Sequence, residues 1–393
     1  MQLFLAILLL SCAQFGSQIF FPALPELALY FDISNVEAQQ IIMLYFIGFG
    51  LSQLLFGPWS DYAGRKKIFL IGQAVFILGT FVCATAVSPT MLAIGRVMQG
   101  IGAGAPVIVS RTMLSDNLDG SELKKAMASL AVAASVVSLI APLVGGWVTT
   151  EASWQVLFIL VGVYLVITWW IGFKLLVKRN MQRIKPSMVE VLIEYKNLFI
   201  DPRFVTPSLF KWLPTMVFLS SATFLPFELQ QKLSLSAQDY GVYIMIPALG
   251  LILGTSITRV LQKYTSYENM LALFWPLLFI AGGMLTLLPF SLTTTLTAYT
   301  LFMISAGAYF PCSLHLLIEP FRHKAGTVNA LCGATDMFVF SALAVLVNKL
   351  WINDIKSMGI FYLIVSFLLA VNWGLMYLRN KARSTNYAIE SVS

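Results

Sequence analysis

The chain has 393 residues, of which 58% are hydrophobic and only 11% charged, and its mean hydropathy is +0.81. Charged residues make up about 25% of an average soluble domain, and a soluble core of this length cannot hide so much apolar surface. The composition therefore excludes an ordinary soluble protein, and the net charge of +7 has to be explained within a membrane protein.

Hydropathy predicts an all-α membrane protein with about twelve transmembrane helices. Each crossing needs about 20 apolar residues, and short connections make consecutive helices antiparallel neighbours. No Lys or Arg precedes the first apolar run, so we interpret it as a span rather than as a cleaved signal. The predicted spans are 3–25, 38–57, 67–87, 90–113, 124–148, 154–177, 204–228, 237–259, 269–290, 293–318, 325–347 and 358–379.

The longest break between apolar runs divides the spans six and six, as is typical of a duplicated transporter. Within it, residues 189–199 predict an amphipathic helix on the membrane surface. The expected organisation is an N-terminal six-helix bundle over 1–177, a cytoplasmic linker over 178–203, a C-terminal six-helix bundle over 204–380 and a cytoplasmic tail over 381–393.

Lys and Arg concentrate in alternate connections, which predicts the orientation. With the N-terminus in the cytoplasm, the outer faces carry only Lys232, Lys349 and Lys356, while Arg96 lies inside a span. The positive-inside rule then places both termini in the cytoplasm. Anionic lipid headgroups account for the positive charge, so no nucleic-acid partner is expected.

The sequence offers no pattern typical of a metal or catalytic site. Its four cysteines lie in apolar stretches without metal-type spacing, and only two histidines are present. A Walker loop, an HExxH motif and a plausible catalytic triad are all missing. We therefore expect no metal, no catalytic residue and no enzymatic activity.

A glycine-rich, basic segment joins the second and third predicted spans. It reads Gly-Pro-Trp-Ser-Asp-Tyr-Ala-Gly-Arg-Lys-Lys over 57–67 and resembles the signature G-x-x-x-D-x-x-G-R-[KR]-[KR] of the major facilitator superfamily. Its glycines allow close helix approach and a tight turn, and its aspartate can pair with a basic group or a helix N-terminus. The resemblance implies that this loop gates alternating access, whereas an ordinary basic turn is the alternative. The gating residues expected are Gly57, Asp61, Gly64 and Arg65.

The fourth predicted span carries an arginine, Arg96, at the start of the sequence Arg-Val-Met-Gln-Gly-Ile-Gly-Ala. This sequence is similar to the R-x-x-Q-G-x-G-[AG] motif of the same superfamily. An arginine inside a bilayer costs about 2.5–3.5 kcal/mol unless it is paired or hydrated, so Arg96 should face a cavity or a partner. The resemblance associates it with proton coupling, and a structural arginine satisfied by backbone carbonyls is the alternative.

The fifth predicted span ends in Ala-Pro-Leu-Val-Gly-Gly over 141–146, which resembles the antiporter motif G-P-x-x-G-G with alanine in the first position. Pro142 interrupts the helix hydrogen bonding, while Gly145 and Gly146 permit close packing. In the family this motif accompanies exporters rather than importers. A kinked, tightly packed helix is the alternative.

The end of the first span narrows the resemblance. Its sequence Phe-Phe-Pro-Ala-Leu-Pro-Glu over 20–26 resembles the P-A-L-P segment of the bicyclomycin-resistance-type, twelve-span drug:proton antiporters. Many of these have a carboxylate where this chain has Gln18, and EmrD-like exporters have glutamine there. The resemblance covers nearly the whole chain. It implies two pseudo-symmetric bundles of the major facilitator fold around a central cavity, with a proton gradient as the energy source and no cofactor.

An antiporter needs a group that titrates inside the membrane. Besides Arg96, the candidates for proton coupling are Glu228, Asp336 and Glu26. An ion pair with Lys232 is the alternative for the first of these, a hydrogen-bonded packing contact for the second and simple solvation for the third. The polar candidates for the cavity wall are Gln14, Gln18, Tyr45, Tyr243 and His315, the last a possible proton relay, and ordinary helix packing is the alternative for each.

These features together predict a monomeric, proton-coupled antiporter that exports small amphipathic molecules or drugs across the bacterial cytoplasmic (inner) membrane by alternating access. Its expected partners are a small-molecule substrate, protons and the lipid bilayer. A dedicated exporter of one metabolite, such as a siderophore or a sugar, stays open. A proton-coupled importer is disfavoured by the antiporter motif, and a membrane enzyme or scaffold by the missing catalytic pattern.

Overall fold

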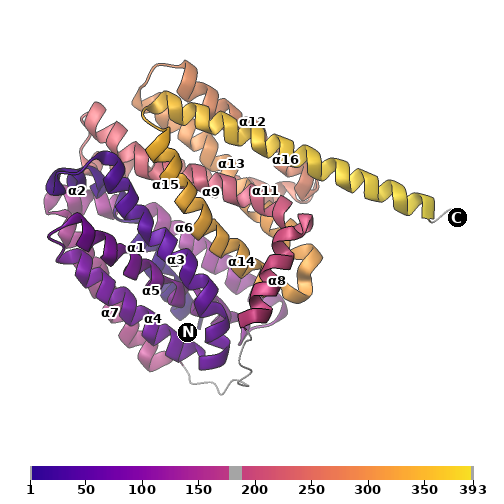
Figure 1. Cartoon of the computed structure of the whole chain (residues 1–393), viewed down its shortest axis with the longest axis horizontal. Helices are drawn as coiled ribbons and strands as arrows, with labels where there is room; N and C mark the ends of the chain where they lie inside the picture. Colours follow the sequence, from indigo (N-terminus) through magenta and orange to yellow (C-terminus); the bar gives the residue numbers. More distant parts are fainter. Residues whose placement is uncertain (1, 177–187, 391–393) are drawn as a thin grey trace. The chain divides into compact units, whose positions relative to one another are not determined.

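The computed structural model describes residues 2–176 and 188–390, and every regular element within these ranges is helical (Figure 1). The chain divides into two compact units, each built from several stretches of sequence. Unit 1 comprises Met1–Leu192, Leu219–Ile246 and Ala330–Leu350, and unit 2 comprises Ile193–Phe218, Pro247–Asn329 and Trp351–Ser393. Parts of the second half of the sequence thus belong to the same unit as the first half.

Unit 1 is built around α5 (Pro89–Ser115), which makes its most extensive contacts with the helices before it in the sequence. Glycines of α5 allow this approach, since a Cβ at Gly100 or Gly102 would meet backbone atoms of the neighbouring helices. The elements of the first half are α1 (Gln2–Gln18), η1 (Phe21–Ala23), α2 (Leu24–Phe31), α3 (Asn35–Ala63), α4 (Arg65–Ala84), α6 (Gly120–Glu151) and α7 (Trp154–Leu175).

Elements from the second half complete unit 1. They are the last residues of α9 (Pro202–Phe227), then η2 (Glu228–Lys232), α10 (Ala237–Tyr243), η4 (Asp336–Phe340) and α15 (Ser341–Leu350). Helix α10 packs against α6, and both η4 and α15 pack against α3.

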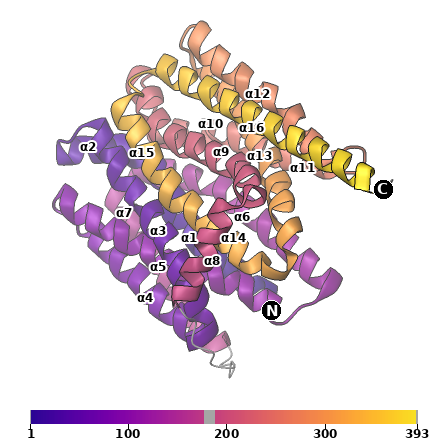
Figure 2. The ribbon, with the colours of Figure 1, turned by 45° about the vertical axis from the view of Figure 1, so that its right-hand side comes forward.

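Unit 2 contains the remaining helices wholly or in part. Its most extensive packing joins α12 to α16 and α13 (Figure 2), and the α12–α16 contact places the backbones of Gly282 and Gly359 against each other. The elements are α8 (Met188–Ile200), the first part of α9, α11 (Met245–Leu261), α12 (Tyr267–Leu287), α13 (Leu292–Ile318), η3 (Glu319–Lys324), α14 (Ala325–Thr335) and α16 (Ile355–Glu390).

Eleven helical stretches among the described residues are long and apolar enough to cross a membrane. They coincide with predicted spans. The predicted seventh span corresponds to α9, which has 26 residues but is not among the eleven, because Lys211, four prolines and several hydroxyl residues interrupt its apolar run. The prediction of an all-α membrane protein is confirmed.

Three of the spans are not continuous α-helices. The first extends to Phe31 rather than residue 25 and is broken into α1, η1 and α2, because Pro22 and Pro25 cannot donate backbone hydrogen bonds. The eighth consists of α10 and α11. The eleventh contains the π-helical turn η4, which begins at Asp336, and a second π-helical turn, η2, begins at Glu228.

Candidate functional site

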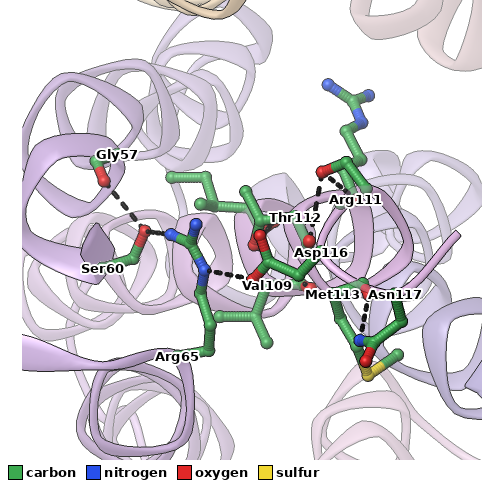
Figure 3. A network of polar contacts seen from close by, with 11 residues as sticks. Gly57, Ser60, Arg65, Val109, Arg111, Thr112, Met113, Asp116 and Asn117 are labelled. Carbon is green, nitrogen blue, oxygen red and sulfur yellow. Dashed lines mark hydrogen bonds and ion pairs between the residues drawn. The ribbon is translucent and has the colours of Figure 1, made fainter. Parts of the chain in front are cut away.

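The gating segment is held by an arginine at the start of α4. Arg65 donates from Nε to Oδ2 of Asp116 at 3.1 Å and from Nη1 to Oγ of Ser60 at 2.5 Å, and Ser60 donates to the carbonyl of Gly57 (Figure 3). Gly64 separates α3 from α4 with φ = +89°, a conformation that favours glycine. The segment and the end of α5 therefore form one connected network.

The partner of Arg65 was not among the predicted site residues. Asp116 lies 51 positions from Arg65, and no local feature of the sequence indicates that the two residues pair. The side chain of Asp61 lies outside the described residues, so its predicted role in this loop stays a prediction. Arg111 is exposed, and its guanidinium points away from the Arg65–Asp116 pair (Figure 3).

Arg96 is fully buried in unit 1 and is held by neutral groups. Its Nη1 donates to the carbonyl of Gly16 at 3.1 Å and to Oε1 of Gln99 at 2.9 Å, and its Nη2 donates to the carbonyl of Ile42 at 3.5 Å. Its guanidinium also lies 5.0 Å from the ring centre of Phe20 and 4.7 Å from that of Tyr45. Among the described residues no carboxylate pairs with it, and its Nε has no acceptor.

The structure thus gives Arg96 the backbone-carbonyl contacts of the structural alternative, and it also gives the buried, unneutralised charge that a coupling role requires. An unpaired charge in a low-dielectric interior exerts a strong field on neighbouring groups. Tyr45, a predicted cavity residue, is buried beside it and donates to the carbonyl of Ala13 at 2.8 Å. Tyr45 therefore contacts both Arg96 and the backbone of α1.

Two further predicted cavity residues form an amide pair on α1. Gln18 donates from Nε2 to Oε1 of Gln14 at 3.0 Å and to Oγ of Ser138 on α6 at 2.9 Å. All three side chains are partly exposed. The structure therefore brings Gln14 and Gln18 together, and it adds Ser138, which sequence reasoning missed because α6 carries many small residues without a distinguishing pattern.

The antiporter segment of α6 lies at a close contact between helices of unit 1. A Cβ at Gly145 would meet the carbonyl oxygen of Ile19, and a Cβ at Gly146 would meet the carbonyl oxygen of Ala237. Pro142 lies inside α6, and its carbonyl is close to Gly241 of α10. Only glycine fits at 145 and 146 without displacing backbone, so the motif is needed for α6 to approach both α1 and α10.

Glu228 is buried at the start of η2 and pairs with Lys232, whose Nζ lies 2.7 Å from its Oε2. The side chain of Lys232 is half exposed. The ion pair is the one given as the structural alternative.

Asp336 is fully buried at the start of η4. This turn packs against α3, where a Cβ at Gly50 would meet the backbone of Phe338. Glu228 and Asp336, the two carboxylates shown buried among the described residues of unit 1, thus share a feature, since each is the first residue of a π-helical turn. Such turns occur frequently at functional sites.

Glu26 is partly buried near the start of α7. Its Oε1 accepts from the backbone N–H of Trp154 at 3.4 Å, while its Oε2 is buried and has no partner among the described residues. The indole N–H of the fully buried Trp154 also has no acceptor in the described part of the chain. Glu26 therefore contacts the first turn of α7 and is only partly open to solvent.

The last two predicted cavity residues lie apart from these groups in the chain. Tyr243, at the end of α10, is partly exposed in unit 1. His315 belongs to unit 2, where it stacks on Tyr267 with ring centres 4.1 Å apart and lies 3.8 Å from Glu319. With Arg322 and apolar residues these groups line a surface pocket of about 380 Å³.

A buried polar cluster that the sequence did not indicate joins three helices of unit 1. Asn348 donates from Nδ2 to Oε1 of Gln39 at 2.7 Å, to Oγ1 of Thr223 at 3.1 Å and to the carbonyl of Ser220 at 3.3 Å. Gln39 and Asn348 are 309 positions apart. A lone Asn at the end of an apolar run gives no signal of such a partner.

Comparisons with known proteins agree with the motifs. The model of the Major Facilitator Superfamily matches residues 6–345. Multidrug resistance protein D of Escherichia coli (strain K12) is 27% identical over 387 residues, which cover 94% of each chain. Multidrug resistance protein MdtL of Salmonella paratyphi C (strain RKS4594) is 25% identical over 322 residues, which cover 82% of this chain and 81% of that one.

Among solved structures, that of the nucleoside transporter NupG matches with a TM-score of 0.72 and 14% identity, covering 95% of this chain and 99% of the other. At this identity the likeness shows the fold alone. The resemblance to the superfamily is confirmed, and it places α9 as the remaining crossing beside the eleven apolar spans. The chain therefore belongs to the Major Facilitator Superfamily, with twelve membrane-spanning helices, and it is a transporter rather than an enzyme.

Proposed function

We propose that this transporter exports small amphipathic molecules, including drugs, in exchange for protons. The observation that carries the proposal is the pair of buried carboxylates, Glu228 and Asp336, each at a π-helical turn of unit 1. A carboxylate is costly to bury in a membrane unless it has a function. Relatives named as multidrug resistance proteins support the choice of cargo.

The direction of transport is supported by the antiporter motif. Gly145 and Gly146 bring α6 against Ile19 and Ala237, so this contact is formed by backbone surfaces without room for side chains. In the proposed cycle the contact seals one side of the membrane while the other is open, and the bundles over 1–177 and 204–380 rock around a central site. The segment around Arg65 is the opposing, cytoplasmic gate.

Protons and substrate are coupled through the states that they favour. Protonation of Glu228 weakens its attraction to Lys232, and Lys232, being half exposed, is then solvated. A ligand shifts a two-state equilibrium only by its differential affinity for the two states. Coupling therefore requires only that the proton and the cargo favour opposite states. No cofactor is required. We further propose that the transporter lies in the bacterial inner membrane, has both termini in the cytoplasm and works as a monomer.

The test uses purified protein in liposomes under an imposed pH gradient, with a fluorescent cationic dye as cargo. We expect net accumulation of dye only with the gradient, and its loss on adding a protonophore. Replacing Glu228 with Gln or Asp336 with Asn should reduce gradient-driven dye transport at least tenfold for the residue that carries the proton. Dye exchange without a gradient should persist, since the fold is retained.

Glu151→Gln is the matched control, because Glu151 is an exposed carboxylate at the end of α6 and its loss should leave transport unchanged. Full gradient-driven transport in both the Glu228→Gln and the Asp336→Asn variant would contradict the proposed proton site. A folded wild-type protein that moves no dye would instead favour a dedicated exporter of one metabolite.

A further inference from the structure

Helix α8 presents an apolar stripe that no described residue covers. Leu192, Ile193 and Ile200 are 63%, 54% and 68% exposed, and the exposed Lys196 lies among them. With 3.6 residues per turn these four positions fall within about one third of the helix circumference. The helix therefore has one continuous apolar side with a single basic residue in it.

The other sides of α8 are attached to unit 2. Glu194 accepts from Nζ of Lys324 in η3 at 2.9 Å, and Leu198 is buried. The ring of Phe199 lies 5.7 Å from that of Phe204 and 6.3 Å from that of Trp212, both on α9. Partial burial and the nearby Glu194 carboxylate raise the pKa of the Tyr195 hydroxyl. Helix α8 is thus fixed on one side and bare on the other.

A sharp corner sets the direction of α8. The chain turns at Asp201, whose Oδ1 accepts from the backbone N–H of Arg203 at 2.8 Å, and Pro202 begins α9. Figures 1 and 2 both show α8 running across the direction of α9. Since α9 is the seventh crossing, a helix that runs across it lies along the membrane plane.

The charge of this region fits an anionic lipid surface. Lys196 can lay its alkyl chain along the apolar stripe and place its ammonium group among phosphates. Four more basic residues precede the helix in the sequence, and basic residues near an interfacial helix favour an anionic membrane. They are Lys178, Arg179, Arg183 and Lys185.

We propose that α8 is an interfacial anchor that binds anionic phospholipid through Leu192, Ile193, Lys196 and Ile200. Through the Glu194–Lys324 ion pair, the anchor ties η3, the segment after α13, to the lipid surface. An amphipathic helix with basic and bulky apolar residues on one side is typical of such an interfacial segment. The proposal is independent of the cargo and of the proton site.

The test places an environment-sensitive NBD fluorophore on Leu192→Cys and, as the matched control, on Asn197→Cys, which is also exposed but lies outside the stripe. The four native cysteines are buried, so the wild type gives the labelling background. In vesicles that contain anionic lipid, whose negative surface potential attracts basic residues, the label at 192 should emit at shorter wavelength. Spin-labelled lipid should quench it at least twofold more than the label at 197, and aqueous iodide should quench it less.

Equal iodide quenching at both positions would overturn the proposal, because the stripe would then face water. Protection of position 192 from both iodide and spin-labelled lipid would also overturn it, since the stripe would then be covered by protein. Loss of the lipid contact in wholly zwitterionic vesicles, or in a Lys196→Gln variant, would support the anionic lipid chemistry; an unchanged contact in both would exclude it.

The Glu194–Lys324 ion pair is tested by the rate at which each lysine is acetylated, as measured by mass spectrometry. In Glu194→Gln, Lys324 should react at least twofold faster, because its ammonium group loses the carboxylate that holds it. Lys67, an exposed lysine of α4, should react at an unchanged rate and is the control. An unchanged rate at Lys324 would remove η3 from the proposed anchor.

Discussion

Two arginines of unit 1 contrast in how their charges are compensated. Arg65 has a side chain that is 13% exposed and pairs with a carboxylate, Asp116. Arg96 is fully buried and is surrounded by carbonyl oxygens, one amide and two aromatic rings. The first charge is neutralised within the molecule and fixes a turn. The second keeps its net charge, so the protonation or binding of another group nearby changes its energy.

Arg96→Leu is expected to have the largest effect on transport and stability. Gly16 and Gln99 would lose their donor at a buried position, and an unsatisfied buried group costs about 1–3 kcal/mol. We expect transport to fall at least tenfold and the free energy of unfolding to fall by about that amount, as measured in dye-transport and denaturant-unfolding experiments. Arg111→Leu is the control, since Arg111 is exposed.

If Arg96→Leu kept full transport with only a change in stability, the arginine would be structural and the coupling role would be wrong. The opposite result, full stability with loss of transport, would strengthen that role. The comparison between the two arginines therefore depends on measuring both properties for the same variant.

Replacement by lysine keeps the charge at each arginine position, and we expect it to have a smaller effect on stability. The guanidinium of Arg96 donates in two directions from a planar group and lies against Tyr45, and an ammonium group reproduces neither arrangement. Arg96→Lys should cost about 1 kcal/mol of stability, the lower end of the cost of unmade hydrogen bonds, because the ammonium group can still donate to some of these acceptors. Arg65→Lys should retain most of its stability, because a single contact with Asp116 suffices. Equal losses in the two lysine variants, measured by thermal unfolding, would remove the distinction.

The Arg65–Asp116 pair itself should contribute less. Exposed ion pairs are worth about 0.2–1 kcal/mol, and this pair lies near the upper end because both side chains are mostly covered. A double-mutant cycle with Arg65→Met and Asp116→Asn should give a coupling energy of that size, decreasing as salt is raised. A coupling energy near zero would mean that Ser60 and Gly64, rather than the ion pair, hold the turn.

The sequence predicted the fold well because the bilayer sets the length and polarity of every crossing. Apolar runs of about 20 residues are local features, and the amphipathic segment that became α8 is local too. Pro22 and Pro25, which break the first span, are local features as well, although we predicted a single helix there. Such features need no knowledge of what lies across the molecule.

The site was harder to predict because its contacts join distant parts of the chain. The motifs identified Arg65 and Arg96, but their partners Asp116, Gly16 and Ile42 become neighbours only after folding. Backbone carbonyls carry no sequence signal at all. The π-helical turns at the two carboxylates were likewise not predicted, since no residue type in these segments distinguishes them from ordinary helix.

The smallest effect is expected from Arg111→Ala, which tests whether contact geometry decides the role of a charge. Arg111 and Asp116 both lie at the end of α5, yet of the two only Asp116 contacts Arg65, and the Arg111 side chain points away (Figure 3). Exposed substitutions without such contacts usually change stability by less than about 0.5 kcal/mol. We expect Arg111→Ala to unfold at nearly the wild-type denaturant concentration, with Asp116→Ala clearly below it. An equal loss in both variants would mean that Arg111 has a charged partner in another state of the transport cycle. The contrast between neutralised and unneutralised arginines would then differ from one state of the cycle to the next.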